Sequence, residues 1–376
     1  MPAFSMLFGL SGLPFWFSLF PFTVPLVLVW AAQTGGWSWL AVPLLVFGLV
    51  PLLDGLLGPA PAGAPAPRGL NIWLLMAWVP IQLLMLIWGA ATAASLSGYG
   101  LLGLALGAGI CTGATGITLA HELMHRRSRL DKSLSLILLL SVSYMHFYIE
   151  HLRGHHRRVA TPGDPATALL GESFYRFYPR ALKGCWTTAW QLEAGRLQRR
   201  SLPFWHNQMI WFSLLPVALA TALGLAWGWP AALFFAVQSI VAFSLLESVN
   251  YVEHYGLARR EIRAGVYEPV QMAHSWNADQ LLTGSLMFML QRHSDHHAHP
   301  ARPWHQLHHA PESPQLPAGY AAMILLALLP PLWHRVMDPR ARQVLAAGTD
   351  IRPGSQEPNS KIQYTEISQI QLIVNS

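Results

Sequence analysis

Residues 99–125 read YGLLGLALGAGICTGATGITLAHELMH, and this stretch decides the fold. It contains no charged side chain before Glu122, and a run of about 20 apolar residues is long enough for a helix to cross a bilayer. The run ends in two histidines, His121 and His125. The stretch therefore predicts a membrane-spanning helix that presents a pair of imidazoles at one end.

The composition of the whole chain points the same way. Of the 376 residues, 53% are apolar and 11% are charged, whereas a soluble domain has about a quarter charged residues. The first apolar run lacks a basic leader and a small-residue cleavage site, so we expect it to be retained as a span. Cys111 and Cys185 lie far apart and support neither a disulfide framework nor a cysteine metal site. An ordinary soluble domain is excluded, and no nucleic-acid partner is expected.

Six stretches are long enough to span a membrane, and they predict an all-α, polytopic membrane protein with three helical hairpins. They cover residues 14–32, 38–57, 70–92, 99–121, 207–227 and 230–250. The short connectors after the first, third and fifth spans contain no Lys or Arg. All 24 Lys and Arg then fall on one side, which the positive-inside rule identifies as the cytoplasm, together with both termini.

Two further apolar runs are interpreted differently. If residues 133–149 crossed the membrane, the histidines on either side of them would face opposite sides, so this run is expected to lie at the interface or to dip in partway. Residues 320–333 are interpreted in the same way. A Pro/Ala-rich connector occupies residues 59–67. We expect one membrane-embedded domain over residues 1–345, with a cytoplasmic, His-rich cap, and a polar tail or linker over 346–376.

Four histidine clusters lie on the predicted cytoplasmic side. Spacing of four residues puts two imidazoles on one helix face, which suits a shared metal ion. Zinc takes about four ligands, so nine histidines are too many for one ion and fit two ions with four or five ligands each. Imidazole suits Zn, Cu, Fe and Ni, so the ligands alone do not name the metal. The candidate ligands are His121, His125, His151, His155, His156, His254, His293, His296 and His297.

Each cluster also has an acidic residue beside a histidine. Metal-bound imidazoles usually donate their other N–H to a carboxylate or carbonyl. Sequence neighbours point apart on a helix, so each acid is expected to orient a histidine of another cluster, or else to balance nearby arginine charge. One or two of the acids could also bind metal directly. The residues expected to support the ligands are Glu122, Glu150, Glu253, Asp295, His274 and Asn250.

Two other classes of function compete. His121 to His125 also matches the H-E-x-x-H motif of zinc proteases, in which the Glu acts as general base. That function needs one zinc and leaves most of the clustered histidines unexplained. A transporter would place ionisable residues near the bilayer midplane, and Glu247 is almost the only candidate there. Metal analysis separates the alternatives, because one zinc favours a protease and two irons favour an oxygenase.

The histidine clusters resemble the three histidine boxes of membrane desaturases and hydroxylases, and Asn250-xxx-His254 resembles a further ligand motif of that superfamily. Two longer strings, NYVEHYGL at 250–257 and LQRHSDHHAHP at 290–300, are more specific. They resemble the bacterial membrane alkane 1-monooxygenases, and the similarity covers residues 15–345. The histidine boxes alone would also fit a related fatty-acyl or aromatic-methyl hydroxylase or a desaturase.

The resemblance implies a non-haem di-iron enzyme in the bacterial inner membrane, with the nine histidines as ligands and no catalytic residue beyond them. Such an enzyme inserts one atom of O2 into the terminal C–H bond of a medium-chain n-alkane, giving a 1-alkanol and water. Electrons would come from rubredoxin and its NADH-dependent reductase. A rubredoxin iron takes four thiolates and this chain has two cysteines, so the donor is expected on a separate chain or beyond the tail. The Arg-rich cap, including residues 176–200, would attract an acidic donor, although membrane topology alone also explains these charges.

Overall fold

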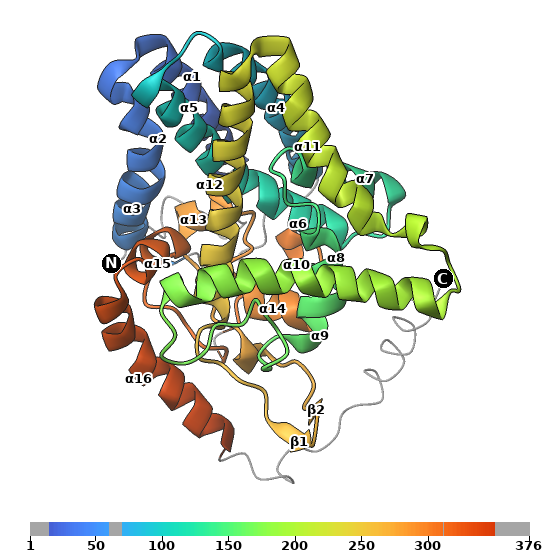
Figure 1. Cartoon of the computed structure of the whole chain (residues 1–376). Coiled ribbons are helices and arrows are strands. Elements are labelled where there is room, and N and C mark those ends of the chain that lie inside the picture. The colour runs from blue at the N-terminus through green and yellow to red at the C-terminus, as the bar shows by residue number, and fades with distance from the viewer. Residues whose placement is uncertain (1–14, 60–69, 311, 350–376) are drawn as a thin grey trace.

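The regular structure of the chain is almost entirely helical. The structure, a computed structural model, describes residues 15–59, 70–310 and 312–349. Within these ranges the strands form a single antiparallel pair, β1 (Glu261–Arg263) with β2 (Val266–Tyr267). Long apolar helices stand side by side in the upper part of Figure 1, α10 (Phe174–Arg199) crosses beneath them, and the β1–β2 hairpin lies below α10. The predicted all-α membrane architecture is confirmed.

Five helical stretches in the described residues are long and apolar enough to cross a membrane, and the chain is a multi-pass membrane protein. They match the second to sixth predicted spans: Gly36–Leu57, Leu75–Ala93, Gly98–Met124, Gln208–Trp227 and Trp229–His254. The first predicted span corresponds to a shorter apolar helix, Ser18–Thr34. At 1.5 Å per residue a helix of about 20 residues matches the hydrocarbon thickness.

The membrane part combines three long continuous helices, α4 (Leu70–Ala93), α11 (Gln208–Trp227) and α12 (Trp229–His254), with spans made of shorter helical segments joined end to end. In chain order the elements are η1 (Phe15–Phe22), α1 (Thr23–Thr34), η2 (Gly36–Leu40), α2 (Ala41–Leu44), η3 (Leu45–Leu49), α3 (Val50–Leu57), α4, α5 (Gly98–Cys111), η4 (Thr112–Ile117), α6 (Thr118–Met124), α11 and α12. The segments η3 and η4 are π-helical turns within spans. Such turns are rare and occur frequently at functional sites.

The remaining helices form the cap, except that α7 (Arg129–Leu140) dips in among the spans. They are α7, α8 (Phe147–Glu150), η5 (His151–His155), α9 (His156–Arg158), η6 (Phe204–His206), η7 (Met272–His274), α13 (Leu281–Leu286), α14 (His293–Ala298), η8 (Trp304–Gln306), α15 (Tyr320–Ala327) and α16 (Pro330–Thr349), in addition to α10. The segment η5 is a third π-helical turn.

Glycines let the spans α5–η4 and α12 approach closely. A Cβ at Gly109 would lie 2.5 Å from the Cβ of Val241, and one at Gly113 would lie 2.9 Å from the Cα of Ala242. Small residues at such contacts allow membrane helices to pack backbone to backbone. The close packing brings the ends of these two spans together, and each end carries candidate metal ligands.

The segment 133–149 dips in among the spans and returns. Helix α7 ends at a turn where the Ser141 hydroxyl accepts a hydrogen bond from Gln82 Nε2 (2.7 Å) and the Ser141 carbonyl accepts one from Gln238 Nε2 (2.8 Å). Both glutamines lie in the interior of spans. The segment therefore dips partway into the membrane part and does not lie flat at the interface. The histidines before and after it stay at the same end of the molecule.

The C-terminal helices form a sharp bend. Helices α15 and α16 meet at an angle of 119°, a geometry typical of a broken span or a re-entrant loop rather than of one straight span. Helix α16 continues to Thr349, so the first residues of the predicted tail are helical. The rest of the tail, and the Pro/Ala connector after Pro59, lie outside the described residues.

The connectors without Lys or Arg all lie at one end of the bundle. Figure 1 shows the turns between α1 and α2, α4 and α5, and α11 and α12 at the top and the cap toward the bottom. The sequence places the arginines in the segments at the cap end. The charge asymmetry of the sequence is therefore a charge asymmetry of the molecule. That the cap faces the cytoplasm remains a prediction.

Candidate metal centre

All nine candidate histidines converge in two groups where the spans meet the cap. The five-histidine group comprises His121, His125, His151, His156 and His296, and the four-histidine group comprises His155, His254, His293 and His297. Within each group, one ring nitrogen from every member lies within 4.8 Å of those of the others. This division matches the four or five ligands per ion expected from the sequence.

The Nε2 atoms face one another, and this arrangement fits metal ions. In the four-histidine group the Nε2 of His293 lies 2.8 Å from that of His297 and 3.2 Å from that of His254. In the other group the Nε2 of His151 lies 2.9 Å from that of His156. The buried Nε2 atoms of His121 and His296 have no protein hydrogen-bond partner in the described part of the chain. Inward-facing imidazole nitrogens are the donor set that transition metals bind.

The π-helical turn η5 divides three neighbouring histidines between the groups. A spacing of four residues predicts that His151 and His155 share a metal, but the structure separates them. The wider turn of a π-helix places residue i+5, as well as i+4, beside residue i. Here the Nε2 of His151 pairs with that of His156, whereas His155 is held by Asp164 and faces the other group. His121 and His125 lie at the end of the α-helix α6, and they share a group, as the spacing of four residues predicted.

Burial keeps most of these imidazoles neutral. Burial, followed by repulsion from neighbouring imidazoles, lowers the pKa of His125, His156 and His293 well below the ordinary value of 6.5. A neutral imidazole is the form that binds a metal ion. His155 is different: burial lowers its pKa, but the charge of Asp164 outweighs burial and raises it.

Asp164 is a site residue that sequence reasoning missed. Its Oδ2 lies 2.9 Å from Nδ1 of His155 and accepts a hydrogen bond from the Thr167 hydroxyl (2.7 Å). A carboxylate on Nδ1 fixes the tautomer that points the Nε2 lone pair into the four-histidine group. Asp164 lies in a loop, so no helical spacing identifies it as a site residue. The one feature of the sequence that could have indicated it is its position as a lone acid shortly after the histidines at 155 and 156.

Three of the four predicted acidic residues contact arginines. Glu122 pairs with Arg126 (3.1 Å), Glu150 with Arg158 (3.1 Å) and Asp295 with Arg302 (2.6 Å). These three acids therefore balance arginine charge, which was the second of the two roles expected from the sequence. Since Glu122 is occupied by Arg126, it is also poorly placed to act as the general base of a zinc protease.

Glu253 is the exception among the acids. Its Oε2 lies 3.1 Å from Nε2 of His293, the same atom that faces His254 and His297. The carboxylate of Glu253 thus stands among the inward-facing atoms of the four-histidine group and could add an oxygen ligand there.

The two remaining predicted supporting residues, His274 and Asn250, lie outside both groups. His274 contacts Glu268 (3.3 Å) and accepts a hydrogen bond from the backbone N–H of Gln271 (2.9 Å). Asn250 donates to Glu247 Oε2 (3.3 Å) and lines a cavity next to the histidines.

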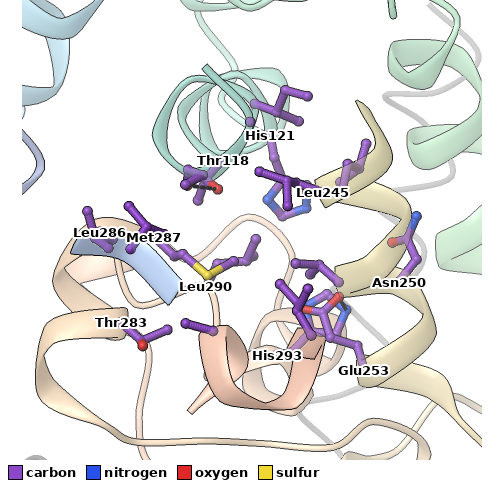
Figure 2. Close-up of a pocket in the computed structure, with 18 of the residues that line it drawn as sticks. Thr118, His121, Leu245, Asn250, Glu253, Thr283, Leu286, Met287, Leu290 and His293 are labelled. Carbon is purple, nitrogen blue, oxygen red and sulfur yellow. Dashed lines mark hydrogen bonds and ion pairs between the residues drawn. The ribbon is translucent and has the colours of Figure 1, made fainter. Parts of the chain in front are cut away.

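That cavity lies between three spans and the helices α13 and α15. Figure 2 shows Leu245, Leu286, Met287 and Leu290 around its centre, with His121 at one side and His293 beside Glu253 at another. The cavity is therefore an apolar space that opens directly onto ring edges of both histidine groups.

The hydroxyls in the cavity wall are directed elsewhere. Thr118 donates to the backbone carbonyl of Ala114 (2.9 Å), and Thr283 donates to Asp54 Oδ2 (2.5 Å). Away from the histidine end, the cavity offers a ligand mainly hydrocarbon contacts.

The two groups differ in exposure. Every member of the four-histidine group is buried, whereas His125 and His156 of the five-histidine group are partly exposed. Access from the cap surface therefore exists on the side of the five-histidine group.

A helical membrane protein with two histidine groups at the ends of its spans fits the membrane desaturase and hydroxylase class, and the family model described as fatty acid desaturase matches residues 95–327. The chain is 44% identical to alkane 1-monooxygenase 2 of Pseudomonas aeruginosa, over 86% of this chain and 90% of that protein. It is 37% identical to alkane 1-monooxygenase of Pseudomonas putida, over 87% and 84%. The chain belongs to the alkane 1-monooxygenase family, as its motifs predicted. It is also 27% identical to the xylene/toluene monooxygenase hydroxylase component of Pseudomonas putida, over 60% of each chain.

Proposed function

We propose that this protein hydroxylates the terminal carbon of medium-chain n-alkanes, using O2 and two iron ions held by the nine histidines. The observation that carries the proposal is the apolar cavity ending on two convergent groups of imidazoles. The relatives named alkane 1-monooxygenase support the substrate class.

The cavity suits a substrate without polar groups. Ligand pockets are mostly apolar, and a few polar groups orient the ligand. Here the wall hydroxyls are bonded to the protein, so the apolar side chains Leu245, Leu286 and Leu290 provide the contacts for a hydrocarbon chain. One end of the chain would then lie against His121 and His293.

The donor set is compatible with iron, and the proposed reaction needs a redox-active metal. Zinc has no redox chemistry. Bound in the two groups, irons would supply the reduction of O2 and the oxidation of the C–H bond. The protein's part is to hold neutral imidazoles in place, with Asp164 orienting His155, and to keep water out through the apolar wall.

We infer that electrons come from rubredoxin, which an NADH-dependent reductase reduces, and that it docks near His125 and His156. These are the partly exposed members of the two groups. The exposed cations Arg127, Arg129 and Arg157 are close to them in sequence and would attract an acidic donor. This position differs from the 176–200 stretch considered from the sequence alone. The proposed location is the bacterial inner membrane, with the cap in the cytoplasm.

Metal content and product analysis on the purified protein test this function. We expect about two irons per chain, and 1-alkanol from an alkane, O2, rubredoxin and reductase. His254→Ala should lower iron content and abolish the product, whereas His206→Ala, outside both groups, should do neither. A single zinc with no oxidised product would refute the proposal. Oxidation of aromatic methyl groups or fatty acyl chains in preference to alkanes would point to the related enzymes instead.

A further inference from the structure

The proposed hydroxylation consumes protons as well as electrons, and this inference depends on that function. Its balance is R–H + O2 + 2 e⁻ + 2 H⁺ → R–OH + H2O, with the electrons supplied by the external donor. The apolar cavity wall, whose hydroxyls point away, offers no proton carrier away from the histidines. The protons must therefore enter at the histidine end, either past the partly exposed His125 and His156 or through buried polar groups that reach this end.

A buried polar chain reaches the cavity from the α7–α8 turn. The Tyr144 hydroxyl donates to Glu247 Oε1 (2.6 Å), and Asn250 Nδ2 donates to Glu247 Oε2 (3.3 Å). Glu247 and Asn250 share a face of α12 because they are three residues apart. Asn250 lines the cavity, as does Glu253 at its histidine end (Figure 2). The chain therefore joins the turn to the reaction space.

Glu247 makes no salt bridge to a lysine or an arginine in the described ranges. Among the described residues its partners are a hydroxyl and an amide, and it forms no ion pair. An unpaired buried carboxylate is costly when ionised, so a carboxyl in this position is stable with a proton on it. Carboxyl groups in short hydrogen bonds to hydroxyls can take up and release protons in catalysis.

The outer end of the chain lies beside His146. The rings of Tyr144 and His146 have their centroids 4.3 Å apart, and His146 also packs against Trp186 of α10. His146 is buried, and neither of its ring nitrogens has a protein hydrogen-bond partner in the described ranges. Buried polar atoms of this kind usually bond to water. They therefore favour water next to Tyr144, on the α10 side.

We propose that Tyr144 and Glu247 relay protons from the His146 side into the cavity, with Asn250 as the positioning residue. Glu247 passes its proton to a water molecule at the histidine end of the cavity, and the carboxylate that is left accepts the hydrogen bond of the Tyr144 hydroxyl at Oε1. The Tyr144 hydroxyl then replaces that proton and recovers its own from the His146 side. Asn250 holds the carboxyl against the cavity wall through Oε2.

The experiment compares Glu247→Gln and Tyr144→Phe with Tyr178→Phe in the iron-loaded enzyme. The control is matched because the Tyr178 hydroxyl also bonds to α12, at Ser244 (2.6 Å), and not to Glu247. Both relay variants should keep the iron content and unfolding midpoint of the wild type. Their turnover should fall about 100-fold, and the ratio of rates in H2O and ²H2O should rise. The control should change none of these.

Infrared spectroscopy gives a readout that does not depend on turnover. The wild type should show the C=O band of a protonated carboxyl that shifts on exchange into ²H2O, and Glu247→Gln should lack this band. Unchanged turnover in both relay variants, or no such band in the wild type, would overturn the relay. If Glu247→Gln does not fold, the turnover of Tyr144→Phe alone decides whether the relay exists. Failure of wild-type hydroxylation would refute the proposed function instead, and the band would still be measurable.

Discussion

The grouping of His151, His155 and His156 depends on one π-helical turn, and this can be tested through metal stoichiometry. His151 and His156 belong to the five-histidine group and His155 to the other. The double variant His151→Ala/His156→Ala should damage one group and retain about one ion per chain. His151→Ala/His155→Ala should damage both groups and retain less than one, because effects at separate sites add. Equal stoichiometry in the two double variants would contradict the division.

Leu286 is a wall residue whose size should control the length of substrate. Leu286→Phe adds volume inside the cavity, so long alkanes should lose turnover relative to short ones while iron content stays unchanged. Product analysis with alkanes of increasing length measures the effect. Leu225→Phe, at a position 84% exposed on the bundle surface, is the control and should leave the profile as it is. An unchanged profile in Leu286→Phe would exclude this wall from the binding site.

At the scale of elements, Asp54 joins the second span to α13. Its buried carboxylate accepts hydrogen bonds from the backbone N–H groups of Leu282 (2.7 Å) and Thr283 (3.1 Å), and from the Thr283 hydroxyl. Asp54→Ala leaves these donors without a partner, which should destabilise the protein by roughly 1–3 kcal/mol. Thermal unfolding measures the loss. Asp54→Asn keeps an acceptor oxygen and should lose less; equal losses would mean that the carboxylate acts only by filling space.

Glu193 ties α10 to its neighbours in a pH-dependent way. Its buried carboxylate contacts Arg153 (2.6 Å) and Arg196 (2.8 Å) and accepts a hydrogen bond from the backbone of Gln208. Burial alone would raise the pKa of Glu193, but these partners outweigh it and lower the pKa below the ordinary 4.5.

The sign of the effect follows from that shift. A lowered folded-state pKa contributes stability that is present above the unfolded-state value and is lost as the pH falls through the folded-state value. Glu193→Gln should therefore lower the unfolding midpoint at pH 7, and the gap from the wild type should close as the pH falls below 4.5. A gap that is independent of pH would show that charge is not the cause.

At the scale of the whole molecule, the orientation in the membrane can be tested with cysteine labelling. The two native cysteines are buried, so single new ones report cleanly. In cells whose inner membrane is intact, a membrane-impermeant thiol reagent should label Ser97→Cys, in the α4–α5 connector. It should label Arg263→Cys, in the β1–β2 hairpin, only after that membrane is broken. The reverse pattern would invert the proposed topology.

Local patterns in the sequence were sufficient to predict five long spans and the nine histidines that converge in two groups, because hydropathy and four-residue spacing are local properties. Features that depend on tertiary packing were not predictable in this way. Nothing in the sequence signals the π-helical turn that separates His155 from His151. Asp164 lies in a loop without periodicity, and the depth of the α7–α8 turn depends on Gln82 and Gln238 in distant spans.

The unequal exposure of the two groups has a practical consequence for handling the protein. A chelator could approach the five-histidine group past His125 and His156, whereas the other group is enclosed. Ions would then be stripped in two stages, and a preparation washed with chelator could hold a single ion in the enclosed group. Such a sample would look like a mononuclear protein and would be inactive, although every side chain needed for the complete centre was still in place.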